Sequence, residues 1–422
     1  MFSYEYLCVY HYSLTKHVYR ELSFLKGLLG KKEKAAYKAV ILRLLYRMYI
    51  LFPHKEIWLI CDRVDKADDN GEAFFEYVCQ QKNKKIKSVF AVSKISTEYS
   101  RIKKIGKVVK PAGWLYKWYH LCGAKIISSQ GEDSVFHPFG IYSLYYADLI
   151  QKSKFIFLQH GVICNDLTDW LRKYNKNIHM FVTTTMPETN SILEYDYGYT
   201  SEIVKPLGLP RYDKLYHEEK KYITFLPSWR AYLVGIKDNQ TGKHNVLKGF
   251  EKSGYYKMYS SVLSNRNLID FAKSKGYIIR FMSHPNMSEC TKLLEMDENI
   301  QIMTMGDYTY RQIFAETSLL ITDYSSVAFD FAYLRKPVLY YQFDYNEFYS
   351  GKHTLNSGYF EYEEDGFGEV IYQEEKLADI IIEYIQNECA LKEKYKKRIN
   401  DTFIYEDKNN CKRIYEAICE LK

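Results

Sequence analysis

The sequence lacks the features that define several large classes of protein. Its nine cysteines are an odd number and include no CxxC pair, so we expect reduced thiols rather than a disulfide framework or a zinc site. Only 9 prolines and 21 glycines occur in 422 residues, which excludes collagen-like and low-complexity sequence. No GxGxxG, GxxxxGK[ST], HExxH or GxSxG motif occurs, which argues against Rossmann dehydrogenases, P-loop enzymes, zincins and α/β-hydrolases.

Long hydrophobic runs are also missing. The most apolar stretch, residues 39–52, is interrupted by Arg43 and Arg47 and is shorter than the ~20 residues that span a bilayer. The first 20 residues lack the basic-then-apolar order of a signal peptide. We therefore expect a protein that is soluble or lies on a membrane surface, and the location that we predict is cytoplasmic, peripheral on the inner face of the cell membrane.

Charge of one sign does not dominate either. Lys and Arg number 59 and Asp and Glu number 52, so the formal net charge is +7. This balance permits an anionic partner, whereas a nucleic-acid binder usually concentrates its positive charge more strongly, so we expect no nucleic-acid partner. With 47% hydrophobic residues the chain can bury a large core, which excludes disorder as its main state.

Residues 1–52 are predicted to be helical. Apolar residues recur at three- and four-residue spacing (Tyr37, Val40, Ile41, Leu44, Met48, Leu51), and basic residues flank them (Lys31, Lys32, Lys34, Lys38, Arg43, Arg47). Such a pattern is typical of an amphipathic helix on an anionic membrane surface. It is equally typical of a helix packed on its own domain with a solvated basic edge, and both interpretations stay open.

From residue 56 onward, short apolar runs alternate with helix-length segments. The runs EIWLI (56–60), SVFAV (88–92), KIIS (125–128), FIFLQ (155–159) and MFVTT (180–184) form one set, and residues 222–229, 277–285, 300–305, 319–326 and 337–343 form a second. This alternation predicts an α/β fold with parallel sheets in two similar halves. The Pro/Gly-rich segment PLGLPRYD (206–213) marks the boundary between them. We thus expect a helical segment at 1–52, Rossmann-like domains at 53–213 and 214–400, and a C-terminal helix at 401–422.

Residues suited to chemistry stand at the predicted strand ends, where open α/β sheets bind ligands. His160 and Gly161 follow one run, Arg230 and His284 follow two others, and Asp323, Ser325 and Ser326 end a fourth and open a helix (TDYSSVAFDFAYLR). The acidic loop 62–72 opens another helix and brings Asp68, Asp69 and Asn70 near the same region.

Each of these residues has a chemical and a structural interpretation. Two hydroxyls at a helix start suit a phosphate, but Ser is also an ordinary N-cap. Histidine suits general-base work near neutral pH, or a core hydrogen bond, and arginine suits phosphate or the surface. Asp323 would repel a phosphate, so we expect it to orient a donor group or a ribose hydroxyl.

Taken together, several segments resemble the CDP-glycerol glycerophosphotransferase family, the teichoic-acid primases and polymerases with related capsule enzymes. They are FLQHG (157–161), LGLPRYD (207–213), LPSWR (226–230), MSHPN (282–286), ITDYSSVAFDFAYLRKPVLYY (321–341) and FIYEDKNNCKRI (403–414). The resemblance covers about residues 56 to 415. The family's tail usually reads Asp-Gly where this chain has Asp407-Lys408, and its Thr-Trp-Arg is Ser228-Trp229-Arg230 here.

The resemblance implies two Rossmann-like domains facing across a cleft, like the GT-B glycosyltransferases. It implies transfer of glycerol phosphate from CDP-glycerol, or a related CDP-alditol, to a hydroxyl of a lipid-linked or polymer acceptor, with release of CMP. By motif, His160 resembles the family's base, and His284, Ser325 and Ser326 its diphosphate-binding residues, with Asp323 in the same motif. Arg230 matches the Trp-Arg pair, and Asp407 and Arg413 match a tail motif that closes over the nucleotide.

No cofactor and no metal site is implied beyond the donor substrate, and dependence on a divalent metal stays open. Two other functions stay open as well: a GT-B glycosyltransferase that uses a nucleotide sugar, and a non-catalytic membrane-associated scaffold. The identity of the donor separates the first from the phosphotransferase, and release of a nucleotide separates both enzymes from the scaffold.

Overall fold

The computed structural model describes residues 14–132, 135, 138–150, 152–237, 244–304, 306, 308–353 and 355–421. The first 13 residues of the predicted N-terminal segment and Lys422 lie outside this range. No helix in the described ranges is long and apolar enough to cross a membrane. The molecule is an α/β protein whose described strands form two parallel sheets and one small antiparallel hairpin.

The first sheet is built from the N-terminal half of the chain. Its described strands are parallel and take the order β3-β2-β1-β4-β5-β6-β7. They are β1 (Glu56–Cys61), β2 (Ile86–Ala91), β3 (Val108–Val109), β4 (Gly123–Ser128), β5 (Lys154–Phe157), β6 (Met180–Thr183) and β7 (Val204–Pro206). The connecting helices are α3 (Asn70–Gln80), α4 (Tyr99–Ile105), α5 (Trp114–Cys122), η2 (Gly140–Tyr145), α7 (Ala147–Ile150), α8 (Thr168–Leu171), α9 (Lys173–Lys176) and α10 (Met186–Glu194).

The second sheet repeats the same winding. Its order is β12-β11-β8-β13-β14-β15, and it is parallel throughout the described strands. They are β8 (Tyr222–Phe225), β11 (Ile278–Phe281), β12 (Gln301–Ile302), β13 (Thr317–Thr322), β14 (Val338–Tyr341) and β15 (Gly368–Ile371). In chain order each sheet starts at a middle strand, winds outward, and then reverses beside its first strand. Such a reversal leaves a crevice at the carboxyl ends of the strands, at β1/β4 in one half and β8/β13 in the other.

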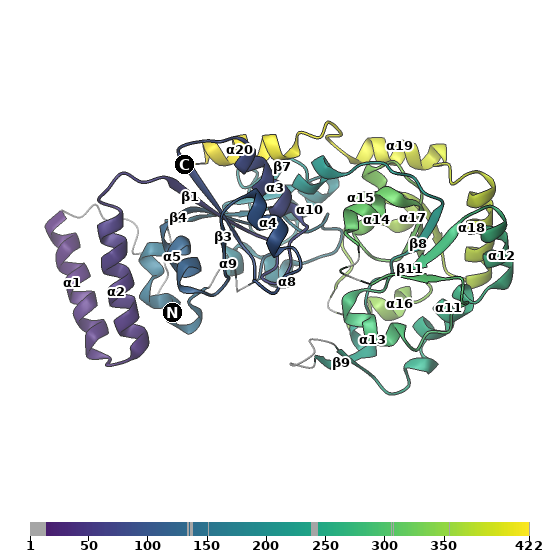
Figure 1. Ribbon diagram of the computed structural model, residues 1–422, viewed down its shortest axis with the longest axis horizontal. Coiled ribbons are helices and arrows are strands. Elements are labelled where there is room, and N and C mark those ends of the chain that lie inside the picture. The colour runs from purple at the N-terminus through teal and green to yellow at the C-terminus, as the bar shows by residue number, and fades with distance from the viewer. Residues whose placement is uncertain are drawn as a thin grey trace.

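Further elements surround this second sheet. The helices are η4 (Ala231–Leu233), η5 (Phe250–Lys252), α11 (Gly254–Leu263), α12 (Arg266–Ser274), η6 (Pro285–Met287), α13 (Ser288–Thr291), α14 (Tyr310–Glu316), α15 (Val327–Tyr333), α16 (Tyr345–Phe348), α17 (Tyr362–Asp365) and α18 (Glu374–Gln386). The hairpin pairs β9 (Val234–Lys237) with β10 (His244–Val246). The two halves lie side by side in the elongated molecule (Figure 1).

Helices cover both faces of each sheet, and this explains the continuous apolar strands in the sequence. In β1, Ile57 and Leu59 face one core cluster while Trp58 and Ile60 face another, and all four are buried. The strands that the sequence predicted are present, with ends shifted by a few residues. Strands β3, β7, β9, β10 and β15 were not predicted, because they are short or carry polar residues.

The N-terminal segment forms α1 (Leu14–Gly30) and α2 (Lys34–Tyr49), which pack side by side at one end of the molecule (Figure 1). Arg43 is 2% exposed and forms ion pairs with Glu21 of α1 and with Asp148 of α7, both at 2.7 Å. Small residues of α2, Ala36 and Ala39, are buried against the rest of the protein. The predicted apolar stripe, however, points outward: the exposed fractions are 58% for Ile41 and Met48 and 74% for Leu51.

The tail crosses back from the second half to the first. Helix α19 (Glu393–Thr402) lies over the second half, and α20 (Asn410–Glu420) lies over the first (Figure 1). The α20 residues Cys411, Ile414 and Ile418 are buried in the same cluster as Trp58 and Ile60 of β1. Helix α20 starts against η3 (Pro210–Lys214), where Asp213 accepts hydrogen bonds from the amides of Asn410 (2.9 Å) and Cys411 (2.8 Å). The chain therefore connects the two halves twice.

Candidate active site

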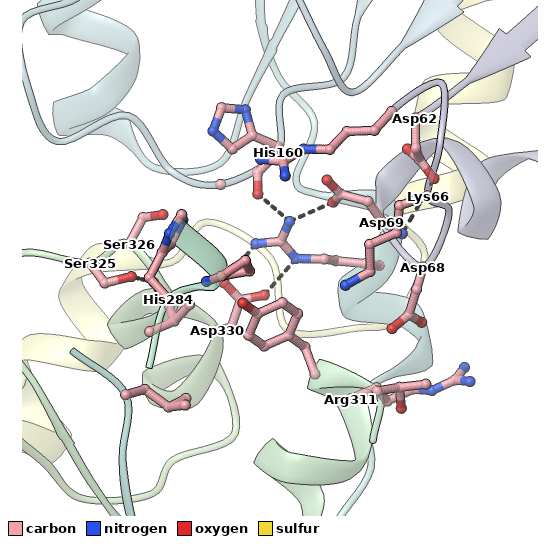
Figure 2. A pocket seen from close by; sticks show the side chains of 18 of the residues that line it. Asp62, Lys66, Asp68, Asp69, His160, His284, Arg311, Ser325, Ser326 and Asp330 are labelled. Atoms are coloured by element: carbon pink, nitrogen blue, oxygen red, sulfur yellow. Dashed lines mark hydrogen bonds and ion pairs between the residues drawn. The ribbon is translucent and has the colours of Figure 1, made fainter. Parts of the chain in front are cut away.

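A cavity of about 870 Å³ opens at the carboxyl ends of both sheets. The loops after β1, β5, β8, β11 and β13 contribute to its walls, so residues from both halves line one space. Among the predicted site residues, His160, Gly161, His284, Ser325 and Ser326 line it. Figure 2 shows His160 across from His284, Ser325 and Ser326.

The backbone that carries His160 is held in an unusual conformation. Gln159 has a φ of 60°, in the left-handed region that non-glycine residues rarely adopt. Its carbonyl accepts a hydrogen bond from Asn70 Nδ2 (2.7 Å), and the carbonyl of His160 accepts one from Arg211 Nη1. Two neighbouring carbonyls are thus fixed from outside the loop, which directs the His160 side chain.

His160 is accessible from the cavity, but many protein atoms surround its ring and keep most of the water away. This burial lowers the pKa of His160 below the ordinary value for histidine, and the positive charges of Arg63 and Arg211 lower it further, while Asp69 opposes them. His160 is therefore neutral near pH 7, which is the form that can accept a proton from a hydroxyl.

Gly161 brings the two walls into contact. A Cβ atom at this position would lie 2.5 Å from Ser326 Oγ and 3.3 Å from Ser326 Cβ. Only a residue without a side chain allows this approach between the β5 loop and the start of α15. Ser325 and Ser326 precede the first turn of α15, and Val327 N–H donates a long hydrogen bond to Ser325 Oγ (3.4 Å). The hydroxyls lie at the point where the two halves meet.

His284 is neutral and oriented. Its Nδ1 accepts a hydrogen bond from the amide of Asn286 (3.2 Å), so in the neutral ring the proton is on Nε2. Burial lowers the pKa of His284 to about 4, with further lowering from Arg63 and from the neighbouring His353 and His244. Its ring stacks on Trp229, with centroids 6.0 Å apart. The neutral ring therefore presents Nε2–H as a hydrogen-bond donor rather than a positive charge.

Arg230 and Asp323 lie behind the cavity wall. Both are 0% exposed and form an ion pair at 3.0 Å, and Arg230 also pairs with Asp344 at 2.7 Å. Asp323 accepts the amide of Ser228 (2.9 Å), so the pair fixes the loop that presents Ser228 and Trp229 to the cavity. Their predicted contacts to substrate stay predictions, whereas their observed contacts position this loop.

Asp407 and Arg413 contact each other rather than the cavity. Arg413 Nη1 lies 2.8 Å from both carboxylate oxygens of Asp407, and its Nε donates to the carbonyl of Leu207 (3.1 Å). Neither is among the described residues that line the cavity. Lys408, which replaces the family's usual glycine, has a φ of 55°, so the backbone conformation that favours glycine is retained here.

Several cations that line the cavity were not predicted from the sequence, and two of them, Arg63 and Arg211, act electrostatically on His160. Arg63 is the second residue after β1, lines the cavity, and acts electrostatically on both His160 and His284. Arg63 could have been predicted in the same way as the other site residues, because it also follows the carboxyl end of a predicted strand. Arg211 was part of a quoted motif, LGLPRYD, but its partners Asp69 and Asp330 are more than a hundred residues away in the chain. No local pattern indicates such a contact.

The arrangement suits transfer of a group between two bound molecules. One wall offers a neutral imidazole as a base, and the other offers the neutral donor His284 and two hydroxyls. No group of three or more His, Cys, Asp or Glu side chains that could hold a metal ion occurs among the described residues.

A family model described as CDP-Glycerol:Poly(glycerophosphate) glycerophosphotransferase matches residues 43–420. The chain belongs to this family. The match includes both sheets, the cavity and the tail helix α20, but begins only within α2.

Relatives of the chain are teichoic acid proteins. The chain is 38% identical over 411 residues to the minor teichoic acid biosynthesis protein GgaB of Bacillus subtilis strain 168, covering 95% of this chain and 44% of that protein. It is 23% identical over 231 residues to the ribitol-phosphate polymerase TarL of Staphylococcus aureus, covering 52% of this chain and 37% of TarL. The chain thus spans less than half the length of the curated relatives it matches first.

Solved structures of the wall teichoic acid polymerase TagF have the same fold. One aligns with a TM-score of 0.64 at 17% identity, covering 97% of this chain and 98% of the TagF chain. A UDP complex of MnaA from S. aureus aligns less well, with a TM-score of 0.54 at 16% identity over 87% of this chain. At these identities the likeness concerns the fold alone.

Proposed function

We propose that this protein transfers an alditol phosphate, glycerol phosphate in the first instance, from a CDP-alditol to a hydroxyl of a lipid-linked or polymer acceptor. CMP is the second product, and the reaction serves teichoic acid or capsule polymer synthesis. The observation that carries this proposal is that His160 faces His284, Ser325 and Ser326 in a cavity that both halves line. Family membership supports it, as does a TagF structure with CDPG, which has the same fold.

The proposed step is an in-line displacement at phosphorus. Neutral His160 takes the proton of the acceptor hydroxyl, and the oxygen attacks the phosphorus that bears the alditol. The new O–P bond forms as the bond to the bridging oxygen breaks, and CMP leaves with that electron pair. His284 Nε2–H and the hydroxyls of Ser325 and Ser326 stabilise the charge on the leaving phosphate.

The two halves then have separate tasks. We propose that residues 53–213 hold the acceptor and residues 214–400 hold the CDP-alditol, as two Rossmann-like domains of a GT-B-like enzyme. Residues 401–422 return from the second domain to the first and so hold the two domains together across the cavity. The repeated strand order of the sheets and the position of α20 support this division.

The function is tested by incubating the purified protein with a glycerol-phosphate-primed lipid acceptor and one nucleotide donor at a time. We expect release of CMP with CDP-glycerol or CDP-ribitol, together with a phosphorus-containing polymer product. A glycoside formed from a UDP-sugar would instead establish a glycosyltransferase, and binding of vesicles without nucleotide release would favour the scaffold.

Substitution of His160 tests the base. We expect His160→Ala to lower the rate of CMP release by about 10²–10⁴-fold while the Kd for CDP-glycerol stays within about twofold. Because the active form is neutral and its pKa is lowered, the wild-type rate should fall only below the ordinary pKa of histidine as the pH decreases. The exposed His217, which does not line the cavity, provides the control His217→Ala. An equal loss of donor binding in His160→Ala would contradict the assignment.

We also propose that α1 and α2 attach the enzyme to the anionic inner face of the cell membrane. The face of α2 that exposes Ile41, Leu44 and Met48 has no cover within the described residues, and Lys31, Lys32, Lys34 and Lys38 are exposed beside it. Arg43 and Arg47 pair with Glu21, and Lys31 donates a hydrogen bond to the Tyr145 hydroxyl (3.1 Å), whereas Lys32, Lys34 and Lys38 are exposed cations along this edge. Apolar burial and attraction to anionic lipid would act together.

Vesicle sedimentation tests the attachment. We expect Ile41→Glu with Met48→Glu to reduce binding to phosphatidylglycerol-containing vesicles at least tenfold, and wild-type binding to weaken as salt increases. Ile302→Glu, at an apolar residue that is 57% exposed on β12, is the matched control. Unchanged binding of the α2 variant would place the attachment elsewhere.

A further inference from the structure

Arg211 of η3 joins the two walls of the cavity. Its Nε and Nη2 donate to the two carboxylate oxygens of Asp330 on α15, at 2.6 and 2.7 Å. Its Nη1 donates to Asp69 in the loop before α3, at 2.7 Å, and also to the carbonyl of His160. One guanidinium therefore contacts the helix that follows Ser325 and Ser326, the acidic loop of the other half, and the backbone of His160.

Asn70 extends this network to the residue before His160. Its Oδ1 accepts the backbone N–H of Arg211 (3.0 Å), and its Nδ2 donates to the carbonyl of Gln159 (2.7 Å). The backbone at Gln159 is left-handed, and the carbonyls of Gln159 and His160 accept hydrogen bonds from Asn70 and from Arg211. Arg211 therefore fixes the direction of both carbonyls, one directly and one through Asn70. Arg211 Nη2 also lies 3.8 Å from the Cβ position of Gly161, at the contact between the two halves.

We propose that Arg211 is a positioning residue that aligns the His160 loop with α15, so that the base and the leaving-group hydroxyls keep one fixed spacing. This inference rests on the proposed function, in which His160 is the base. Arg211 touches no reacting atom in this arrangement; it acts through the His160 carbonyl and through Asp330. A bidentate fork on Asp330 fixes direction as well as distance, which a lysine could not do.

The same ion pair sets the charge around His160. Burial is the largest influence on the His160 pKa and lowers it; Asp69 before α3 raises it, and Arg63 after β1 and Arg211 of η3 lower it. Ser326, the residue before α15, contributes a neutral hydroxyl beside Gly161. Burial lowers the pKa of Arg211, but Asp330 and Asp69 outweigh this and hold it well above its ordinary value, so its charge is permanent.

Loss of Arg211 and loss of Asp69 should therefore shift the pKa of His160 in opposite directions. Arg211→Gln removes a positive charge and leaves Asp69 unpaired, so the imidazolium is stabilised and the pKa rises. Asp69→Asn removes the negative charge and lowers the pKa, and asparagine can still cap α3 as Asp69 does. NMR titration of ¹³C-labelled histidine, with the His160 signal assigned by its loss in His160→Asn, measures both shifts without any need for turnover.

Kinetic measurements distinguish the positioning effect of Arg211 from the effect of its charge. We expect Arg211→Lys to keep the acidic limb of the pH–rate profile near that of wild type, because the positive charge remains. Its kcat should nevertheless fall on the order of 100-fold, because the fork is lost and the loop shifts, with the KM for CDP-glycerol little changed. A residue needed only for folding would lower the yield of native enzyme without this division between kcat and KM.

A second variant guards against misfolding. Asp330 is 1% exposed, so Arg211→Gln leaves a buried unpaired carboxylate, and Arg211→Gln with Asp330→Asn removes that charge. We expect the double variant to melt near the wild-type temperature and still to lose kcat about 100-fold. Arg335→Gln, which breaks an exposed ion pair with Glu406, is the matched control and should leave kcat and the pH profile unchanged.

The outcomes are distinct. Opposite pKa shifts, with loss of kcat in the folded Arg211 variants, support the inference. Shifts in the same direction, or a folded double variant with wild-type kcat, overturn it. Absence of CMP release by the wild-type enzyme would count against the proposed function, and the NMR titration would still decide whether Arg211 and Asp69 control His160.

Discussion

At the scale of single residues, Gly161 shows how closely the two halves of the site fit. We predict that Gly161→Ala lowers kcat on the order of 10- to 100-fold, because the added methyl must displace the Ser326 hydroxyl or separate the walls. Thermal stability should change little, because the atom that it meets is the end of a side chain. Steady-state CMP release and a thermal melt measure the two effects.

A double-mutant cycle makes this prediction specific. Ser326→Ala removes the atom at 2.5 Å and leaves Cβ at 3.3 Å, so Gly161→Ala should cost much less in that background. Gly27→Ala, in α1 with no atom within 4 Å of the added methyl, is the control for a generic glycine effect. Equal costs of Gly161→Ala in the two backgrounds would show that the contact with Ser326 is not the cause.

Single residues also mark the limit of prediction from the sequence. The strand-end rule identified His160, His284, Ser325 and Ser326, all of which line the cavity, because parallel strands bring their carboxyl ends to one edge. It could not identify Asp344 as an ionic partner of Arg230, since Asp344 is 114 residues away and the contact depends on tertiary packing. The same limit concealed the contact between Arg211 and Asp330, 119 residues apart.

At the scale of elements, α20 is a helix of the C-terminal tail that completes the core of the N-terminal half. Ile414 and Ile418 are 0% exposed and pack with residues of β1 and α3. We predict that Ile418→Ala lowers the free energy of unfolding by about 2–5 kcal/mol, because it leaves a cavity in this core. Lys412→Ala, on the exposed face of α20, should change it by less than about 0.5 kcal/mol. Urea denaturation of both variants measures the difference, and a small effect of Ile418→Ala would mean that α20 is only loosely attached.

The elements differ in how well their sequences specify them. Strands such as β1 and β13, buried on both faces, form apolar runs that predict their position directly. The two-residue strands β3 and β12 carry too little pattern for a prediction of their bounds, and β12 was expected to be longer. The apolar period of α2 was correctly identified, but period alone could not say that this face is exposed, because the buried contacts of α2 are made by small residues and by Arg43.

At the scale of the whole molecule, loops of both sheets line one cavity, so we expect donor binding to stabilise both halves. CDP-glycerol at about 100 times its Kd should add about 2.7 kcal/mol to the free energy of unfolding. Because loops of both sheets line the cavity, we predict that the donor slows hydrogen exchange in the strands β1 and β5 as well as in β8 and β13. Hydrogen exchange measured by mass spectrometry, with and without donor, resolves the two sheets.

The double variant Ser325→Ala with Ser326→Ala is the matched comparison. It should retain the fold but bind the donor more weakly, so the donor should protect the amides of both sheets less from hydrogen exchange. Protection confined to β8 and β13 would mean that the donor contacts the second half alone and that the walls close only when the acceptor is bound. In that case Arg211, which already joins α15 to the His160 loop, would hold the halves in place before the donor arrives, and the energy of donor binding would not be needed to align the base. Protection of both sheets would instead make donor binding part of that alignment, because a ligand can bias only the arrangement with which it makes additional contacts.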